Sequence, residues 1–133
     1  MTDPHASVLV ITGLGAVTPF GLGIDAMWRA LLSGVSAISD MDLFDLGGIS
    51  CTRAGVIRGY TPPPGFENGP RASGFAAGAC LEALQQAGLV GDKAALAETA
   101  LLAASNFGDI DAGEAALIPF GQPGFDASAS RHC

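Results

Sequence analysis

Residues 12–21 read TGLGAVTPFG and follow directly on SVLVI at 7–11, an aliphatic and β-branched run that is typical of a buried strand. A glycine-rich turn after such a strand is a common place for a bound nucleotide, so this stretch decides the class of fold. The dinucleotide fingerprint Gly-x-Gly-x-x-Gly needs a third glycine, but Thr18 stands at that position and Pro19 follows it. Proline donates no backbone hydrogen bond and disfavours a helical conformation at the preceding residue. The sequence therefore excludes a Rossmann phosphate site at this turn.

A P-loop is excluded as well, because no Gly-Lys-Ser/Thr follows the turn and the only lysine of the chain is Lys93. The remaining interpretation is a structural turn. Gly13 and Gly15 are expected to permit a close approach of another backbone, and Thr18 with Pro19 is expected to set the direction in which the chain leaves a central sheet.

Composition narrows the classes of function. With 133 residues, 49% of them hydrophobic, and a mean hydropathy of +0.41, residues 1–133 are expected to form a single globular domain. No apolar run approaches the length of a membrane span and residues 1–7 lack the features of a signal peptide, so a cytoplasmic protein that does not enter the membrane is predicted. Thirteen acidic residues against six basic ones give a net charge of -7, which argues against nucleic acid as a partner. No cofactor is predicted.

Three cysteines, Cys51, Cys80 and Cys133, are too few and too widely spaced for a disulfide framework or a zinc site, so reduced thiols are expected. Aspartates 40, 42 and 45 raise the question of a metal, but they lack the glycine and the closing glutamate of a calcium loop. A solvated loop over 37–50, anchored by Phe44, is the favoured interpretation. The sequence thus predicts no metal site.

The rest of the chain alternates between helix and strand patterns. Apolar residues at 24, 27, 28, 31 and 32 have helical spacing, so a helix is predicted over 24–32, ending at Gly34 and carrying Trp28 into a core. Further helices are predicted over 71–87, 92–98 and 110–118, strands over 51–57 and 99–104, an extended linker over 60–70, and a loop or frayed end over 120–133. This alternation indicates an α/β fold with a mostly parallel sheet covered by helices.

A family resemblance adds to this reading. Residues 8–39, VLVITGLGAVTPFGLGIDAMWRALLSGVSAIS, resemble the opening of the β-ketoacyl synthases, the condensing enzymes of fatty acid and polyketide synthesis. Later features are similar in order: TRAGVI at 52–57, the AxxxCLEALQQAGL pattern ending at Leu89, and SNFGD at 105–109. The resemblance covers about residues 8–118 and implies the N-terminal half of a thiolase-like fold.

The resemblance also implies a chemistry, decarboxylative Claisen condensation of acyl and malonyl thioesters, with an acyl carrier protein as partner and a dimer as the assembly. In the family a cysteine at a helix N-terminus takes the acyl group and two histidines assist decarboxylation. Those residues lie beyond the matched region, and this chain offers only His5 and His132. Cys133 beside His132 lies in a terminal loop, while Cys80 and Cys51 are expected to be small buried hydrophobes. No residue is assigned a catalytic role.

The loop Asn106-Phe107-Gly108 corresponds to a glycine-rich loop that borders the acyl pocket in relatives. Phe107 would then shorten that pocket and favour short acyl chains. The alternative is a phenylalanine that anchors its own loop.

Three interpretations remain open. In the first, the chain is the N-terminal portion of a β-ketoacyl synthase that works with the remainder of the enzyme or with a ketosynthase partner subunit, and the ending SASRHC at 128–133, without a helix cap, favours it. In the second, it is a non-catalytic homologue of the chain-length-factor type, or a module that binds a carrier protein. In the third, it is an unrelated small α/β binding domain.

Overall fold

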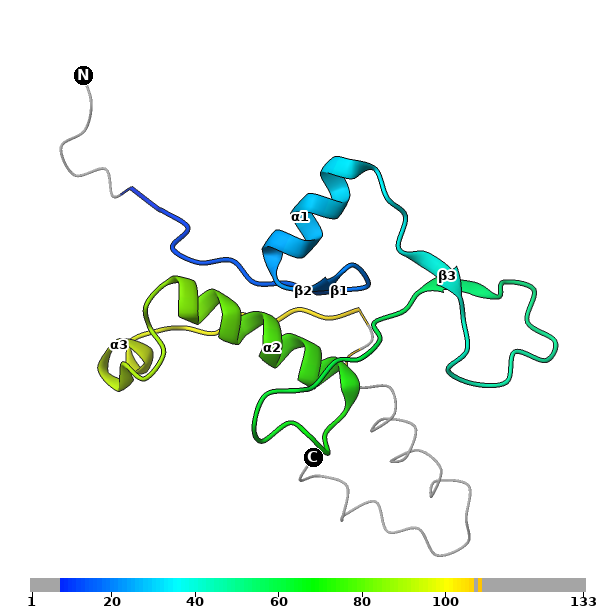
Figure 1. The fold of residues 1–133 in the computed structure, drawn as a ribbon. Coiled ribbons are helices and arrows are strands. Elements are labelled where there is room, and N and C mark those ends of the chain that lie inside the picture. Colours follow the sequence, from blue (N-terminus) through cyan, green and yellow to red (C-terminus); the bar gives the residue numbers. More distant parts are fainter. Residues whose placement is uncertain (1–7, 107, 109–133) are drawn as a thin grey trace, which may run out of the picture.

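The computed structural model describes residues 8–106 and 108. In chain order the elements are β1 (Val17–Thr18), β2 (Gly21–Leu22), α1 (Ile24–Ser33), β3 (Ile38–Asp40), β4 (Arg53–Gly55), α2 (Arg71–Gln86) and α3 (Lys93–Ala97). Figure 1 shows α1 and α2 on opposite sides of the segment that contains β1 and β2, with β3 and β4 projecting away from the helices. The helices therefore bracket the glycine-rich turn.

The three predicted helices within the described residues are confirmed, because their ends are encoded locally. α1 ends at Gly34, whose φ of 68° lies in the left-handed region that favours glycine. α2 is followed by Gly88 with a φ of 70°. α3 begins after Asp92, whose carboxylate accepts hydrogen bonds from the backbone N–H groups of Ala94 and Ala95.

The strands differ from the prediction. β1 pairs with β2 and β3 pairs with β4, both antiparallel, so the described residues contain no parallel pair. β4 lies inside the strand predicted over 51–57, but the loop predicted over 37–50 contains β3 and was wrong there. The reason is cross-strand pairing: Asp40 lies opposite Arg53 in the register, and the guanidinium of Arg53 also donates to the carbonyl of Ile38 at 3.2 Å.

The two most aliphatic runs form no strand. The strands predicted over 7–11 and 99–104 were wrong as far as the structure describes them, since residues 8–11 and 99–104 carry no strand assignment. Among the described residues, no backbone hydrogen bond involves 8–13 or 100–104. A strand exists only through bonds to a neighbouring strand, and neither run has such a neighbour here.

The apolar core is small. Val56, directly after β4, is the only buried hydrophobic residue of the described part of the chain. Trp28 is 58% exposed and Phe44 is 57% exposed, so the predicted core position of Trp28 and the anchoring role of Phe44 were wrong. The apolar stripe of α1 does exist, but only β2 among the described elements packs closely against it.

Two expected elements lie outside the described residues, the helix over 110–118 and the loop over 120–133. None of the helices that the structure describes has both the length and the apolar character needed to cross a bilayer.

Candidate functional site

The glycine-rich turn packs its backbone directly on α2. A Cβ atom added to Gly13 would overlap the carbonyl oxygen of Ala83, and one added to Gly15 would overlap that of Ala79. Residues 79 and 83 are one helical turn apart, so together they present one face of α2. Any side chain at either glycine would push the turn away from the helix.

Two polar side chains of α2 then fix the turn. The carboxylate of Glu82 accepts hydrogen bonds from the backbone N–H of Ala16 at 2.8 Å and from that of Ile24 at 2.9 Å. Gln86 accepts from the N–H of Leu14 at 3.0 Å. Ile24 is the first residue of α1, and its preceding residue Gly23 offers no side-chain cap. Glu82 therefore caps α1 from the neighbouring helix.

Thr18 and Pro19 occupy the tip between β1 and β2. The hydroxyl of Thr18 donates to the carbonyl of Gly21 at 3.2 Å and accepts from the N–H of Phe20 at 3.2 Å. Pro19 lies near β4, since a Cβ atom at Gly55 would come within 3.0 Å of the proline ring. The tip thereby joins the two antiparallel pairs.

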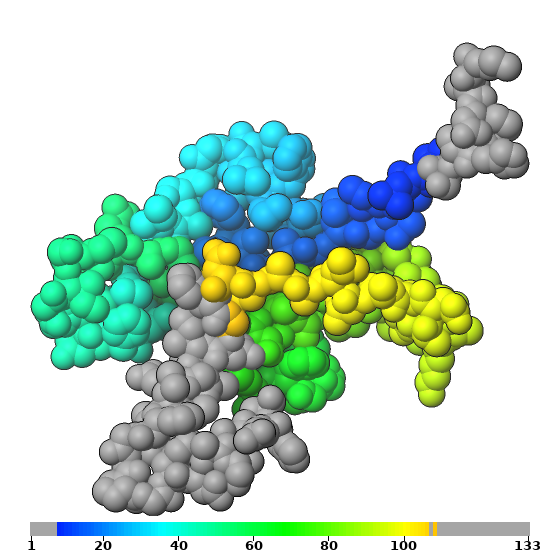
Figure 2. Space-filling model, turned by 180° about the vertical axis from the view of Figure 1, so that it is seen from behind, coloured from blue at the N-terminus to red at the C-terminus, as the bar shows by residue number. Residues whose placement is uncertain are grey.

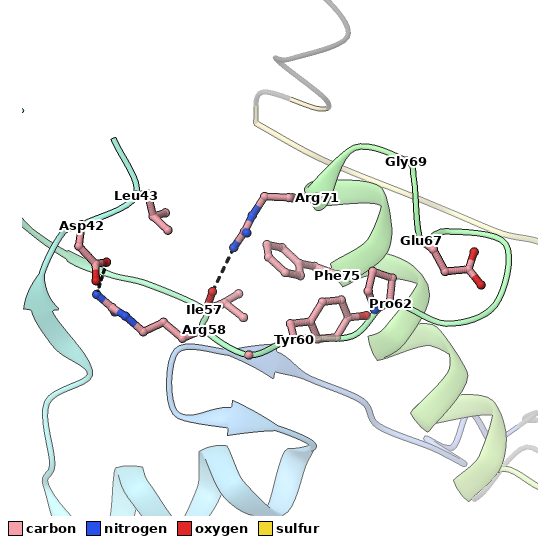
Figure 3. A pocket seen from close by; sticks show the side chains of 11 residues that line it. Asp42, Leu43, Ile57, Arg58, Tyr60, Pro62, Glu67, Gly69, Arg71 and Phe75 are labelled. Carbon is pink, nitrogen blue, oxygen red and sulfur yellow. Dashed lines mark hydrogen bonds and ion pairs between the residues drawn. The ribbon is translucent and has the colours of Figure 1, made fainter. Parts of the chain in front are cut away.

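An open cavity of about 490 Å³ lies between the segments that follow β3 and β4 and the start of α2. Figure 3 shows the side chain of Arg58 extending toward Asp42, that of Arg71 extending toward the backbone at Ile57, and the rings of Tyr60 and Phe75 close to each other. The rings of Tyr60 and Phe75 meet edge to face at 5.1 Å, and the guanidinium of Arg71 lies 5.3 Å from the centre of the Phe75 ring. The cavity is thus walled by aromatic rings and flanked by cations.

Both arginines already have partners. Arg58 donates to the carboxylate of Asp42 at 2.6 Å and to the carbonyl of Asp40 at 2.9 Å. Arg71 donates to the carbonyl of Ile57 at 3.0 Å. The bonds of Arg58 join the segment after β4 to the end of β3, and the bond of Arg71 joins that segment to α2, so their observed role is structural.

The hydroxyl of Tyr60 reaches over the start of α2. It donates to the carbonyl of Gly74 at 2.6 Å. Gly74 is buried, and a Cβ atom there would contact the ring of Pro62 at 3.4 Å. Tyr60 and Pro62, at the start of the linker predicted over 60–70, are therefore packed on α2 where Gly74 leaves room for them.

The three aspartates of the β3–β4 region serve separate purposes. Asp40 lies 3.6 Å from the guanidinium of Arg53, Asp42 pairs with Arg58, and Asp45 accepts from the N–H of Gly47 at 3.0 Å. Within 8–106 and 108, no group of three or more His, Cys, Asp or Glu side chains is close enough to hold a metal ion.

The candidate acyl-pocket residues are only partly described. Asn106 is exposed, and the N–H of Gly108 donates to the hydroxyl of Ser105 at 2.7 Å. Phe107 lies outside the described residues. Their place at an acyl pocket stays a prediction.

The cysteines correct another expectation. Cys51 and Cys80 are both exposed, so their assignment as buried hydrophobes was wrong. Cys80 lines an open groove together with Leu84 and Leu101. Cys133, His132 and His5 lie outside the described residues.

The residues that organise the site were not singled out from the sequence. Glu82 and Gln86 are four positions apart and share a helix face with Ala79 and Ala83. The sequence does contain one signal for them, which is a pair of polar residues on a helix face of small residues. When another backbone packs closely on such a face, its N–H groups need hydrogen-bond acceptors on the helix.

Comparison with known proteins completes the description of the site. The family model "Beta-ketoacyl synthase, N-terminal domain" matches residues 6–122. The 3-oxoacyl-(acyl-carrier-protein) synthase I, chloroplastic, of Arabidopsis thaliana is 47% identical over 60 residues, which are 45% of this chain and 12% of that protein. The family model covers more than half of this chain, whereas the match to this relative covers less than half of the chain and a small part of the relative.

Two other relatives give the same picture. The 3-oxoacyl-(acyl-carrier-protein) synthase 2 of Vibrio cholerae serotype O1 is 36% identical over 52 residues, 39% of this chain and 13% of the relative. The granaticin polyketide putative beta-ketoacyl synthase 2 of Streptomyces violaceoruber is 35% identical over 57 residues, 43% of this chain and 14% of the relative. The matched part spans about an eighth of the length of these relatives.

Proposed function

Because the chain belongs to the β-ketoacyl synthase family, we propose that it forms part of an enzyme that condenses acyl and malonyl thioesters on acyl carrier protein. The observation that carries this proposal is the family match over 6–122, which includes every described helix and strand. The product would enter fatty acid or polyketide synthesis, since relatives of both kinds are matched.

The contribution of this chain to such an enzyme is a framework. The glycine turn, α1 and α2 are fixed relative to one another by Glu82, Gln86 and the close backbone contact at Gly13 and Gly15. No described residue has the geometry of a nucleophile with a base, so the cysteine and the histidines of the family's reaction are assigned to polypeptide outside the described residues.

A mostly parallel sheet belongs to the same proposal. Gly13 lies near Ala83 and Val17 lies near Gly78, so 13–17 runs antiparallel to α2. Cavities flanked by 80–84 with 99–101, and by 72–76 with 103–105, give the run 99–105 the same sense. Two segments that are both antiparallel to one helix are parallel to each other, which supports a strand-helix-strand unit.

The acyl carrier protein, the dimer and the cytoplasmic location stay parts of the proposal. The acyl carrier protein as partner is supported by the names of the relatives, which are 3-oxoacyl-(acyl-carrier-protein) synthases. The dimer rests on the family resemblance, and the cytoplasmic location rests on composition.

The test is to isolate the protein from its own cells with any polypeptide joined or bound to it. Denaturing intact mass and size exclusion establish what accompanies the chain, and the sample is then supplied with acyl and malonyl carrier-protein thioesters. We expect 3-oxoacyl thioester and carbon dioxide. Co-isolation with an active synthase that works equally well without this chain would favour the non-catalytic alternative, and a sample free of both activity and synthase would contradict the proposal.

The acyl-pocket proposal has its own test. Replacing Phe107 by alanine in the active assembly is expected to raise the relative rate with longer acyl chains, because a side chain at the pocket border would be removed. Phe44→Ala is the matched control, since Phe44 is 57% exposed in the loop between β3 and β4. An unchanged chain-length preference in Phe107→Ala would remove the pocket role.

A further inference from the structure

The cavity of about 490 Å³ at the start of α2 is separate from the packing of the glycine turn on that helix. We call it the Arg71 cavity, and Leu43, Ile57, Tyr60, Arg71 and Phe75 are among the residues that line it. Its walls come from the loop after β3, the segment after β4, and the linker that leads into α2. Small-molecule sites have volumes of roughly 300–1,000 Å³, so the Arg71 cavity has room for a ligand of one or two rings.

Arg71 has unused hydrogen-bonding capacity at this cavity. It makes one described hydrogen bond, to the carbonyl of Ile57 at 3.0 Å, and a guanidinium carries several N–H donors. Among the described residues, Arg71 takes part in no ion pair. The ring of Phe75 lies against the guanidinium, with 5.3 Å between the guanidinium carbon and the ring centre. Arg71 is therefore a cation that is held in place and still has donors to offer.

The other charged groups of the cavity are already paired or directed elsewhere. Arg58 and Asp42 form an ion pair at 2.6 Å, so their charges cancel. Glu67 accepts from the N–H of Gly65 at 2.7 Å, and Figure 3 shows its carboxylate directed away from Arg71. The charge left uncompensated beside the aromatic rings is positive, which favours an anion as the ligand.

Charge alone does not make this a binding site, because Arg71 is exposed. Ion pairs between exposed groups are weak in water, so a small anion without a ring gains little there. The rings of Tyr60 and Phe75 are half-buried and meet edge to face at 5.1 Å, and Ile57 is half-buried as well. A flat ring in the ligand adds to this aromatic contact and removes water from the neighbouring ion pair, which strengthens the pair.

We propose that the Arg71 cavity binds an aromatic carboxylate. The carboxylate oxygens accept hydrogen bonds from Arg71, because the planar fork of a guanidinium matches a carboxylate in a bidentate pair. The ring packs against Tyr60, Phe75 and Ile57. This proposal does not rest on the proposed function, since no residue of the cavity has been assigned to condensation.

The test measures the binding of β-naphthoate by equilibrium dialysis. It is done with the recombinant 133-residue chain and with the protein isolated from its own cells together with any accompanying polypeptide. Neutral β-naphthamide and inorganic phosphate are the comparison probes, which carry only the ring or only the charge. We expect β-naphthoate to bind both samples with a dissociation constant on the order of 0.1 mM, and each comparison probe to bind at least about tenfold more weakly.

Variants of Arg71 test its role in binding. Arg71→Gln should weaken the binding of β-naphthoate about tenfold or more, and Arg71→Lys should restore only part of it, because an ammonium lacks the planar fork. Arg29→Gln is the matched control, since Arg29 also donates to one described carbonyl, that of Asp25 at 3.2 Å. Arg29 lies on α1, and Figure 2 shows α1 in light blue and the linker in green on opposite sides of the yellow run 99–106. This control should change the affinity less than about twofold.

A second pair of variants leaves the structural bond of Arg71 intact. Leu43 lines the cavity from the loop after β3 and is 53% exposed, so a polar residue there is compatible with folding. Leu43→Glu should weaken the binding of β-naphthoate about fivefold or more, because a second carboxylate repels the ligand. Leu43→Gln, which is similar in size but neutral, should weaken it clearly less. If Arg71→Gln does not fold, this pair decides the question.

Several outcomes would overturn the proposal. Equal affinities for β-naphthoate and β-naphthamide would mean that the charge contributes nothing, and equal affinities for β-naphthoate and phosphate would mean the same for the ring. Unchanged binding in a folded Arg71→Gln variant, or equal binding by the two Leu43 variants, would place the ligand elsewhere. Binding to the recombinant chain alone would mean that accompanying polypeptide fills the cavity in the assembled protein.

Discussion

Residues 8–11 and 13–24 are adjacent in the chain but lie in opposite environments. The second segment packs on α2 through two glycines and through backbone N–H groups that Glu82 accepts at 2.8 and 2.9 Å. The first segment has the stronger strand pattern, yet its side chains are 68–100% exposed. The position of 13–24 is thus specified by small and polar residues, whereas the aliphatic side chains of 8–11 are left exposed to solvent.

Gly15→Ala should give the largest effect on this contrast. The added methyl group would overlap the carbonyl oxygen of Ala79, so either the turn or α2 must shift. We expect the free energy of unfolding of the chain to fall by about 3 kcal/mol, measured by urea titration with the fluorescence of Trp28. Gly47→Ala is the control, because its Cβ atom would lie 3.5 Å from the nearest atom of Asp45. A similar loss of unfolding free energy in the two variants would contradict the view that the close packing of 13–24 on α2 specifies the position of that segment.

Glu82→Gln should rank second. A carboxylate that accepts from both Ala16 and Ile24 would become an amide with one acceptor oxygen, so one N–H loses its partner. The expected loss is about 2 kcal/mol in the same titration. Glu67→Gln is the control, because the carboxylate of Glu67 accepts a hydrogen bond only from the N–H of Gly65, two residues away. This variant should lower the free energy of unfolding by less than about 1 kcal/mol. An equal cost in both variants would argue against capping by Glu82.

Tyr60→Phe tests whether the first turns of α2 are also held in place by a hydrogen bond from a polar side chain. The variant keeps the ring on Phe75 but removes the hydroxyl that donates to Gly74 at 2.6 Å. We expect a loss of about 1 kcal/mol. Tyr60→Leu, which removes both the hydrogen bond and the ring contact, should lose clearly more. If the two variants match, the ring contributes nothing and the linker is held by the hydrogen bond alone.

Leu9→Ser should have the smallest effect in the recombinant chain. Leu9 is fully exposed there, so the free energy of unfolding should change by less than about 0.5 kcal/mol. A loss comparable to that of Glu82→Gln would show that the run 8–11 is already packed, and would erase the difference between the two segments.

The success of sequence-based prediction followed the range of the interactions. Helix ends depend on nearby residues such as Gly34 and Asp92, and the helices were predicted to within a few residues. The formation of β3 depends on its pairing with β4, and the exposure of Trp28 depends on which segments pack against α1. A single sequence does not give either contact. The bonds of Glu82 span 66 and 58 residues, and no local pattern announces an interaction of that range.

The family was predictable for a related reason. The resemblance rests on 8–39, where Gly13 and Gly15 lie so close to the carbonyl groups of α2 that no side chain fits. Such residues are specific because few alternatives fit. The candidate loop at 106–108 is exposed at Asn106, so its place in a pocket depends on polypeptide that packs against it.

The cap that Glu82 provides has a consequence for the order of synthesis. Ile24 leaves the ribosome 58 residues before the carboxylate that accepts its N–H. At cellular elongation rates of about 5–20 residues per second, that interval is about 3–12 s. A helix of 10 residues without a cap is marginal in water, so α1 emerges as an uncapped amphipathic segment. The cap of α1 therefore forms only after α2 has been made, and the capped helix is the joint product of both segments.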